Sequence, residues 1–116
     1  RREIDVIGLS VQDSRDATVA RLIVNDPDSA EELFMEQGIA YTLSELLVVK
    51  MKECGDLKKC LNQLYEAETN LDYAFSLMVQ RQGHALLALF LEDCEFGASI
   101  LNRAGLTVVY EDELLR

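Results

Sequence analysis

The chain is predicted to adopt an α+β fold built from two copies of one unit, each an antiparallel sheet with helices on one face. The first observation is an ungapped internal repeat, in which the segment Val24–Ile39 returns 67 positions later as Leu91–Leu106. The second is that three segments have apolar residues at helical spacing, and shorter apolar runs between them are typical of strands. The third is that the second copy has a lead-in, Val48–Asn70, for which the first copy has no counterpart after Arg1.

The repeat is carried by the residues that start and stop a helix. Asp26 and Asp93 each precede a helical pattern, and an Asp in that position accepts hydrogen bonds from the first turn. Pro27 suits the first helical position, where its missing N–H costs nothing. Gly38 and Gly105 fall where each pattern stops, the usual place for a left-handed residue. A shared start, stop and following apolar run indicates one supersecondary unit used twice.

Hydrophobic spacing places the elements along the chain. The clearest helix is Asp56–Ala67, in which Leu57, Cys60, Leu61, Leu64 and Ala67 follow the helical repeat. Arg81–His84 is expected to be a turn between two strands. The other expected elements are strands at Ile4–Val11, Thr18–Val24, Ile39–Leu43, Leu46–Met51, Leu71–Val79, Ala85–Leu91 and Leu106–Tyr110, helices at Pro27–Gln37 and Cys94–Ala104, and a tail at Glu111–Arg116.

The order of these elements differs between the two copies. Residues 46–116 follow the order β-α-β-β-α-β, which is the split βαβ or ferredoxin-like plan. Residues 1–45 follow β-β-α-β and lack the opening strand and helix, as though the chain starts inside its first copy. That opening strand would lie inside the sheet, so an open gap is expected beside Thr18–Val24 and Ile39–Leu43. Upstream residues, a swapped element or a partner chain could fill this gap.

Composition narrows the classes of function. A net charge of −10 argues against nucleic acid and anionic membrane surfaces as partners. The apolar runs are too short to span a bilayer, and no signal-peptide pattern is present. Three cysteines without a CxxC motif suit a reducing cytoplasm, and Cys60 is expected in the core. With His84 the single histidine, neither a catalytic triad nor a histidine metal centre is expected, and no cofactor or metal is implied.

At this point the chain resembles a tandem ACT-domain protein over nearly its whole length. The resemblance rests on the βαββαβ order, on Asn70-Leu71-Asp72 opening a strand after a helix, and on the Asp/helix/Gly/strand pattern in both halves. It also rests on Cys54-Gly55-Asp56-Leu57, which is similar to the family's Pro-Gly-x-Leu turn between the first strand and first helix. Cys54 replaces the family's Pro, and Lys52 stands where an acidic residue is usual.

The resemblance implies a non-catalytic regulatory domain that binds a free amino acid at a domain or subunit interface. Backbone N–H groups at a helix start attract a carboxylate, and a glycine allows close approach. The alternatives are a turn glycine with positive φ at Gly55, a helix-start carboxylate at Asp56 and a structural turn residue at Asn70. The candidate ligand-binding residues are Glu53, Cys54, Gly55, Asp56, Leu57 and Asn70.

Four functions stay open on the sequence alone. The first is an amino-acid sensor of amino-acid metabolism, with a small-molecule amino acid as ligand. The second is a regulatory subunit bound to a partner enzyme, for which the small subunit of acetolactate synthase is the comparison. The third is a homodimerisation module whose ligand turn has degenerated, as Lys52 and Cys54 suggest. The fourth is an enzyme, which is disfavoured because no paired carboxylates, activated nucleophile or phosphate loop is evident.

Overall fold

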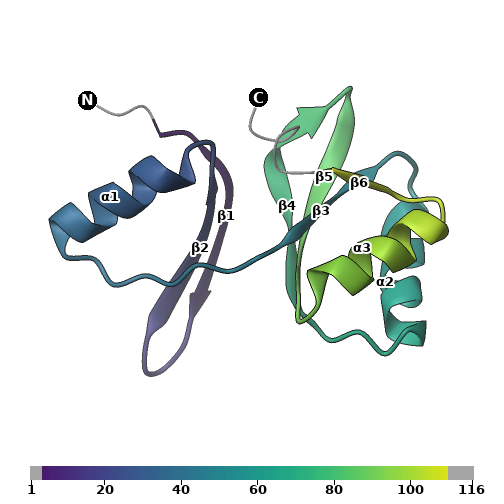
Figure 1. Cartoon of the computed structure of the whole chain (residues 1–116), viewed down its shortest axis with the longest axis horizontal. Helices are drawn as coiled ribbons and strands as arrows, with labels where there is room; N and C mark the ends of the chain where they lie inside the picture. Colours follow the sequence, from purple (N-terminus) through teal and green to yellow (C-terminus); the bar gives the residue numbers. More distant parts are fainter. Residues whose placement is uncertain (1–3, 110–116) are drawn as a thin grey trace.

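The computed structural model describes residues 4–109, which form two antiparallel sheets and three helices (Figure 1). A two-stranded sheet is followed by a helix and then by a four-stranded sheet with two helices. The elements in order are β1 (Val6–Asp13), β2 (Thr18–Val24), α1 (Pro27–Gln37), β3 (Leu47–Met51), α2 (Asp56–Glu66), β4 (Leu71–Arg81), β5 (His84–Leu91), α3 (Cys94–Arg103) and β6 (Thr107–Val109).

The predicted α+β class is confirmed, and one predicted element is wrong. Residues 39–46 are irregular, so the strand expected at Ile39–Leu43 does not form. In the repeat, Ile39–Leu43 corresponds to β6, and β6 pairs with β3. The two-stranded sheet has no strand equivalent to β3, so Ile39–Leu43 has nothing to pair with. The other elements form within about two residues of expectation, while Tyr110 and the tail Glu111–Arg116 lie outside the described residues.

The four-stranded sheet has the order β4-β5-β3-β6 and forms a complete βαββαβ unit. Helices α2 and α3 cover one face of this sheet (Figure 1). Strand β5 is central, which explains its continuous apolar sequence, because both of its faces are buried. The buried core between sheet and helices consists of Leu47, Val49, Cys60, Leu64, Leu87, Leu89, Leu91, Leu101, Leu106 and Val108.

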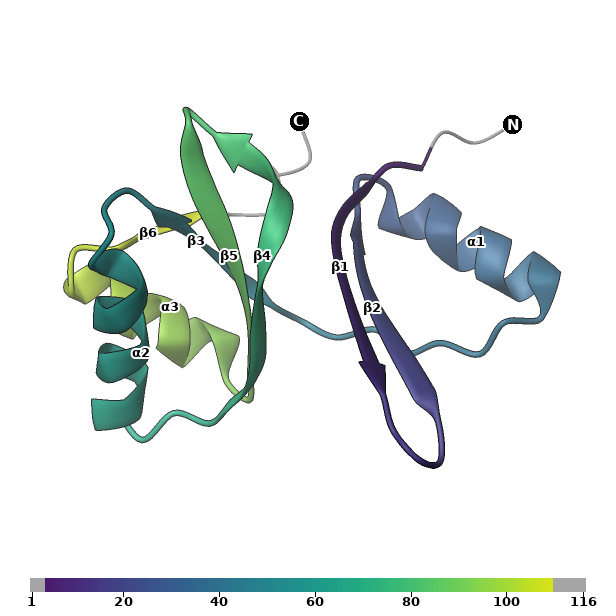
Figure 2. The ribbon, with the colours of Figure 1, turned by 180° about the vertical axis from the view of Figure 1, so that it is seen from behind.

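The two-stranded sheet packs against the opposite face of the four-stranded sheet. The molecule therefore has four layers: α1, the two-stranded sheet, the four-stranded sheet, and α2 with α3 (Figures 1 and 2). Close approach of the sheets depends on Gly8, where an added Cβ would lie 2.7 Å from Cδ2 of Leu77. A second buried cluster fills this layer, formed by Ile7, Ile23, Val48, Leu77, Leu86, Ala88, Phe90 and Val109.

The helix boundaries confirm the signals that carry the repeat. The carboxylate of Asp26 accepts a hydrogen bond from Ser29 N at 3.2 Å, and that of Asp93 accepts one from Phe96 N at 3.0 Å. Gly38 and Gly105 follow the helices with φ of 69° and 89°, which favours glycine. No helix within residues 4–109 is long and apolar enough to cross a membrane.

Candidate functional site

The predicted ligand turn joins β3 to α2 and is held together by Asp56. Its Oδ2 accepts hydrogen bonds from the backbone N–H of Lys52 at 2.8 Å and of Glu53 at 3.1 Å. The N–H of Asp56 in turn donates to the carbonyl of Glu53 at 3.1 Å. Asp56 thus stabilises the turn that precedes the helix, and its carboxylate is already engaged with backbone donors.

Gly55 starts α2 with an ordinary backbone conformation. Its φ of −79° and ψ of −8° are open to any residue, so the alternative of a turn glycine with positive φ is wrong. An added Cβ would meet no atom within 4 Å. Neither the backbone nor packing of the described residues therefore requires glycine, and the turn surface at Gly55 is open.

The start of α2 also differs from the starts of α1 and α3. Asp26 and Asp93 cap those two helices, whereas Gly55 has no side chain and α2 has no side-chain cap. The first N–H groups of a helix lack partners within the helix, and they favour an anion. The turn residues Glu53, Cys54 and Leu57 are exposed around this point. The geometry therefore suits a carboxylate at the α2 N-terminus.

Asn70 does not join this turn. It follows the C-terminal end of α2, and an 11-residue helix spans about 16 Å at 1.5 Å per residue. Asn70 Nδ2 donates a hydrogen bond to Oε2 of Glu92 at 2.6 Å, and the Glu92 N–H donates to the Asn70 carbonyl at 3.2 Å. Asn70 therefore ties the start of β4 to the end of β5 within one copy.

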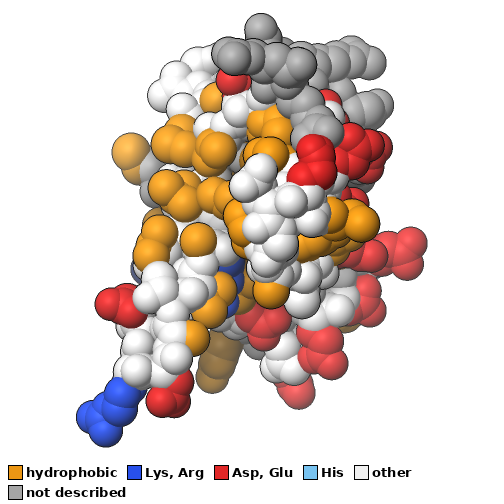
Figure 3. Space-filling view, turned by 90° about the vertical axis from the view of Figure 1, so that its left-hand side faces the viewer, with side chains coloured by type: hydrophobic (Ala, Val, Ile, Leu, Met, Phe, Trp, Pro, Cys, Tyr) orange, Lys and Arg blue, Asp and Glu red, His pale blue; other side chains and the backbone are white. Residues whose placement is uncertain are grey.

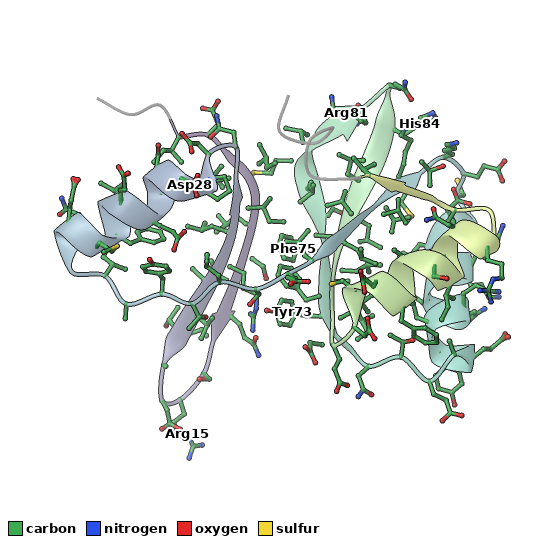
Figure 4. All side chains as sticks on the ribbon, viewed as in Figure 1. Arg15, Asp28, Tyr73, Phe75, Arg81 and His84 are labelled. Atoms are coloured by element: carbon green, nitrogen blue, oxygen red, sulfur yellow. The ribbon has the colours of Figure 1, made fainter. Side chains whose placement is uncertain are left out.

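The Lys and Arg residues of residues 46–109 gather at one end of the four-stranded sheet, and most of the Asp and Glu residues lie at the other. All six Lys and Arg residues lie at the end with the Gly55 turn, where Figure 4 also shows Arg81 and His84. Lys50 at this end donates to Gln82 Oε1 at 2.5 Å. The basic end contains Lys50, Lys52, Lys58, Lys59, Arg81 and Arg103 beside the acidic Glu53 and Asp56, and the opposite end contains Glu66, Glu68, Asp72, Glu92, Asp93 and Glu95.

A cavity of about 340 Å³ lies at the acidic end. Its lining includes Glu45, Asp72, Tyr73, Glu92 and Cys94. The sequence interpretation missed this hollow because Glu45 lies before β3 and reaches the other residues only in the folded chain. The clustering of Asp72 and Glu92 at neighbouring strand ends was the one signal for it in the sequence. Three acidic side chains make this cavity unfavourable for a carboxylate.

The three cysteines are free and differ in exposure. Cys60 is buried in the core, as predicted, and burial raises the pKa of its thiol to about 11. Burial also raises the pKa of Cys94, which is half-buried. Cys54 is exposed in the turn. No group of three or more metal-ligating side chains within residues 4–109 is arranged to hold a metal ion.

The fold and the uncapped turn define a class of small α+β domains in which antiparallel sheets support helices on their outer faces. The family model described as an ACT domain pair matches residues 1–116, and the chain belongs to this family. ACT domains are regulatory modules that often bind amino acids.

A solved structure supports the fold independently. The crystal structure of protein BT0572 from Bacteroides thetaiotaomicron is similar, with a TM-score of 0.84 and 18% sequence identity. The similarity covers 97% of this chain and 78% of that chain. At this identity the likeness shows the fold alone. No curated protein matches the chain.

Proposed function

We propose that this domain pair binds a free amino acid and thereby regulates amino-acid metabolism in the cytoplasm. The ligand's carboxylate is held at the start of α2 by backbone N–H groups of the turn Glu53–Leu57 other than those of Glu53 and Asp56, which donate within the turn. Asp56 holds the turn in shape, and Gly55 leaves its surface accessible. Glu53 is the side chain nearest in sequence that is free to accept the ligand's ammonium, because the carboxylate of Asp56 is engaged.

One observation carries this proposal: the uncapped start of α2 lies at an open glycine on the basic end of the sheet. The positive end of the helix dipole and the Lys and Arg residues there attract an anion. The acidic end repels a carboxylate for the same electrostatic reason. The charge separation therefore favours the Gly55 turn over the 340 Å³ cavity as the site of an amino-acid carboxylate.

Thermal denaturation with each of the twenty amino acids at millimolar concentration tests the proposal. A ligand that binds the folded chain raises its melting temperature in proportion to RT ln(1 + [L]/Kd). We expect a rise with one or a few amino acids, and its loss in Gly55→Ala without loss of the fold. Ser99→Ala on the exposed surface of α3 is the matched control and should keep the response. A melting temperature unmoved by all twenty amino acids contradicts the proposal.

A second candidate function is a regulatory subunit that docks on a partner enzyme, or a homodimerisation module. It is favoured by an apolar stripe on α2 formed by Leu57, Leu61 and Tyr65, whose side chains are all exposed. Residues at this spacing share one helix face, and the side chain of Tyr65 on that face is 83% exposed. Purification of the chain from its own cells tests this function. A chain that elutes alone as a monomer contradicts it.

A further inference from the structure

Helix α1 is attached to its sheet by a shallower contact than α2 and α3 are to theirs. Within residues 4–109, Ala30 is the one side chain that α1 buries, whereas α2 buries Cys60 and Leu64 and α3 buries Leu101. Met35 on α1 is 71% exposed, and Figure 3, which views the molecule from the α1 side, shows hydrophobic side chains gathered on this surface. A helix of 11 residues is marginal on its own in water, so α1 depends on this shallow contact.

The connector that follows α1, residues 39–45, is hydrogen-bonded to α1 and not to a sheet. Tyr41 Oη donates a hydrogen bond to Oε2 of Glu31 at 2.9 Å, and the Tyr41 ring lies 5.5 Å from the Phe34 ring, centroid to centroid. The Ile39 N–H donates to the Phe34 carbonyl at 2.9 Å. In the described part of the chain, no backbone hydrogen bond ties the connector beyond Ile39 to either sheet. Loss of α1 from its sheet therefore releases the connector as well.

The far end of the connector forms part of the wall of the hollow at the acidic end of the four-stranded sheet. Ser44 and Glu45 line this cavity of about 340 Å³ together with Tyr73 of β4 and Cys94 of α3. Cys94 is half-buried. Burial raises the pKa of the Cys94 thiol, and the negative charge of Glu45 adds to this effect, so the connector lies near the thiol. Access to Cys94 therefore depends on the position of the connector.

We propose that α1 and the connector form a lid, residues 27–45, that opens by local unfolding and thereby gives access to the hollow at Cys94. The lid lies between two fixed points of the structure. Ahead of it, the Asn25 N–H donates a hydrogen bond to the Asp5 carbonyl at 3.0 Å. Behind it, Leu46 packs against the buried cluster between the two sheets. The chain on either side of the lid therefore stays in place when the lid opens.

Opening of the lid changes both of its ends. When α1 leaves its sheet it loses its helical structure, because an isolated helix of this length is marginal. The hydrogen bond between Tyr41 and Glu31 then breaks, and Ser44 and Glu45 are free to move away from the hollow. The four-stranded sheet with α2 and α3 stays folded, since among the described residues its helix-covered core includes none from the lid. This proposal does not depend on ligand binding at Gly55.

Native-state amide hydrogen exchange of the 116-residue chain, resolved by residue with NMR, tests the lid. Protection factors in α1 should lie at least about a hundredfold below those in α2 and α3, because local opening costs less than global unfolding. Low concentrations of urea should leave the protection of α1 nearly unchanged, because local opening exposes little surface. Equal protection of all three helices would overturn the proposal, as would a urea dependence in α1 as steep as that in α2.

A matched pair of tyrosine variants tests the connection between the lid and the hollow. Tyr41→Phe removes the hydrogen bond to Glu31 but keeps the ring beside Phe34, whereas Tyr65→Phe changes an exposed side chain on α2. We expect Tyr41→Phe to lower the protection of α1 by about two- to tenfold, which is the usual worth of one hydrogen bond. It should speed iodoacetamide labelling of Cys94 by the same factor. Tyr65→Phe should change neither quantity, and the protection of α2 and α3 should stay the same in both variants.

Two results with these variants would contradict the proposal. Faster exchange in α1 with unchanged labelling of Cys94 would show that the lid does not control access to the hollow. Equal effects of Tyr41→Phe and Tyr65→Phe would show that the hydrogen bond to Glu31 does not hold the lid closed. Peptide mass spectrometry separates the labelling of Cys94 from that of the exposed Cys54.

Discussion

The guanidinium of Arg21 lies 3.6 Å from the centroid of the Tyr73 ring and so joins the two-stranded sheet to the four-stranded sheet. Arg21 Nη1 also donates a hydrogen bond to Oε1 of Gln12 at 3.0 Å, which fixes the guanidinium over the ring. The Tyr73 ring lies 4.4 Å from that of Phe90, centroid to centroid. Figure 4 shows Tyr73 and Phe75 directed toward the layer between the sheets. One cationic side chain therefore connects the two copies of the repeat.

Replacing Arg21 should weaken the packing of the two sheets. We expect Arg21→Ala to lower the free energy of unfolding by about 1 kcal/mol, through loss of the cation–π contact and of packing by the side-chain stem. Urea denaturation followed by circular dichroism measures this change. Arg15→Ala at the exposed tip of the hairpin is the matched control and should change stability little. Equal stability of the two variants would contradict a coupling role for Arg21.

Gly8 sets the distance between the sheets. A valine there would push its Cβ against Leu77 Cδ2 at 2.7 Å and against Ile23 Cδ1 at 3.1 Å. We expect Gly8→Val to destabilise the chain by about 1–3 kcal/mol, the usual cost of overpacking a core. Gly55→Val is the control, because a Cβ at Gly55 meets no atom within 4 Å. Thermal denaturation that ranks the two variants in the opposite order would refute this interpretation.

The cap of α1 should make stability depend on pH. Hydrogen bonds from the side chain and then the backbone of Ser29 hold the pKa of Asp26 below its ordinary value of 3.8. A carboxyl whose pKa is lower in the folded state adds stability above its unfolded pKa and loses it as the pH falls. Asp26→Ala should therefore melt below the unmodified chain at pH 7, and the difference should shrink below about pH 4. A difference that is constant from pH 7 to pH 2.5 would contradict the hydrogen-bonded cap.

The three cysteines should react with iodoacetamide at different rates. The thiolate is the reactive form, and burial both shields Cys60 and raises its pKa to about 11. At pH 8 we expect rapid labelling of exposed Cys54, slower labelling of Cys94, and labelling of Cys60 only after unfolding. Peptide mass spectrometry at timed intervals gives the three rates. Labelling of native Cys60 at the rate of Cys54 would contradict its place in the core.

Local sequence signals predicted most of the fold because they act within a few residues. Asp26, Asp93, Gly38 and Gly105 mark helix ends through hydrogen bonds and backbone angles of their own segments. The prediction of a strand at Ile39–Leu43 was wrong because a strand needs a partner, and the topology rather than the local sequence pattern determines that partner. Leu9, Val11 and Leu22 of the β1–β2 hairpin are exposed for a related reason, because the described residues contain no equivalent of β3 and α2 beside this hairpin.

The candidate site was less predictable than the fold. The sequence placed the Gly55 turn between β3 and α2, but the alternative of a turn glycine with positive φ was wrong, because the structure has an αR conformation there. Hydrogen bonds from the turn backbone to the Asp56 carboxylate hold that conformation. No sequence pattern predicts these hydrogen bonds. Asn70 was grouped with the turn, yet helix α2 separates them. Charge separation along the sheet emerged only once strand order placed distant residues at the same end.

The most direct test of ligand binding at the Gly55 turn is an NMR titration of the ¹⁵N-labelled chain with the amino acid that raises its melting temperature. Binding should shift the amide signals of residues 53–58 and leave those of Asn70 and Glu92 unchanged, since these lie at the opposite end of α2. Gly55→Ala should abolish the shifts, and Ser99→Ala should retain them. Shifts confined to Asp72, Glu92 and Cys94 would place the ligand in the acidic cavity instead and contradict a carboxylate site at the start of α2.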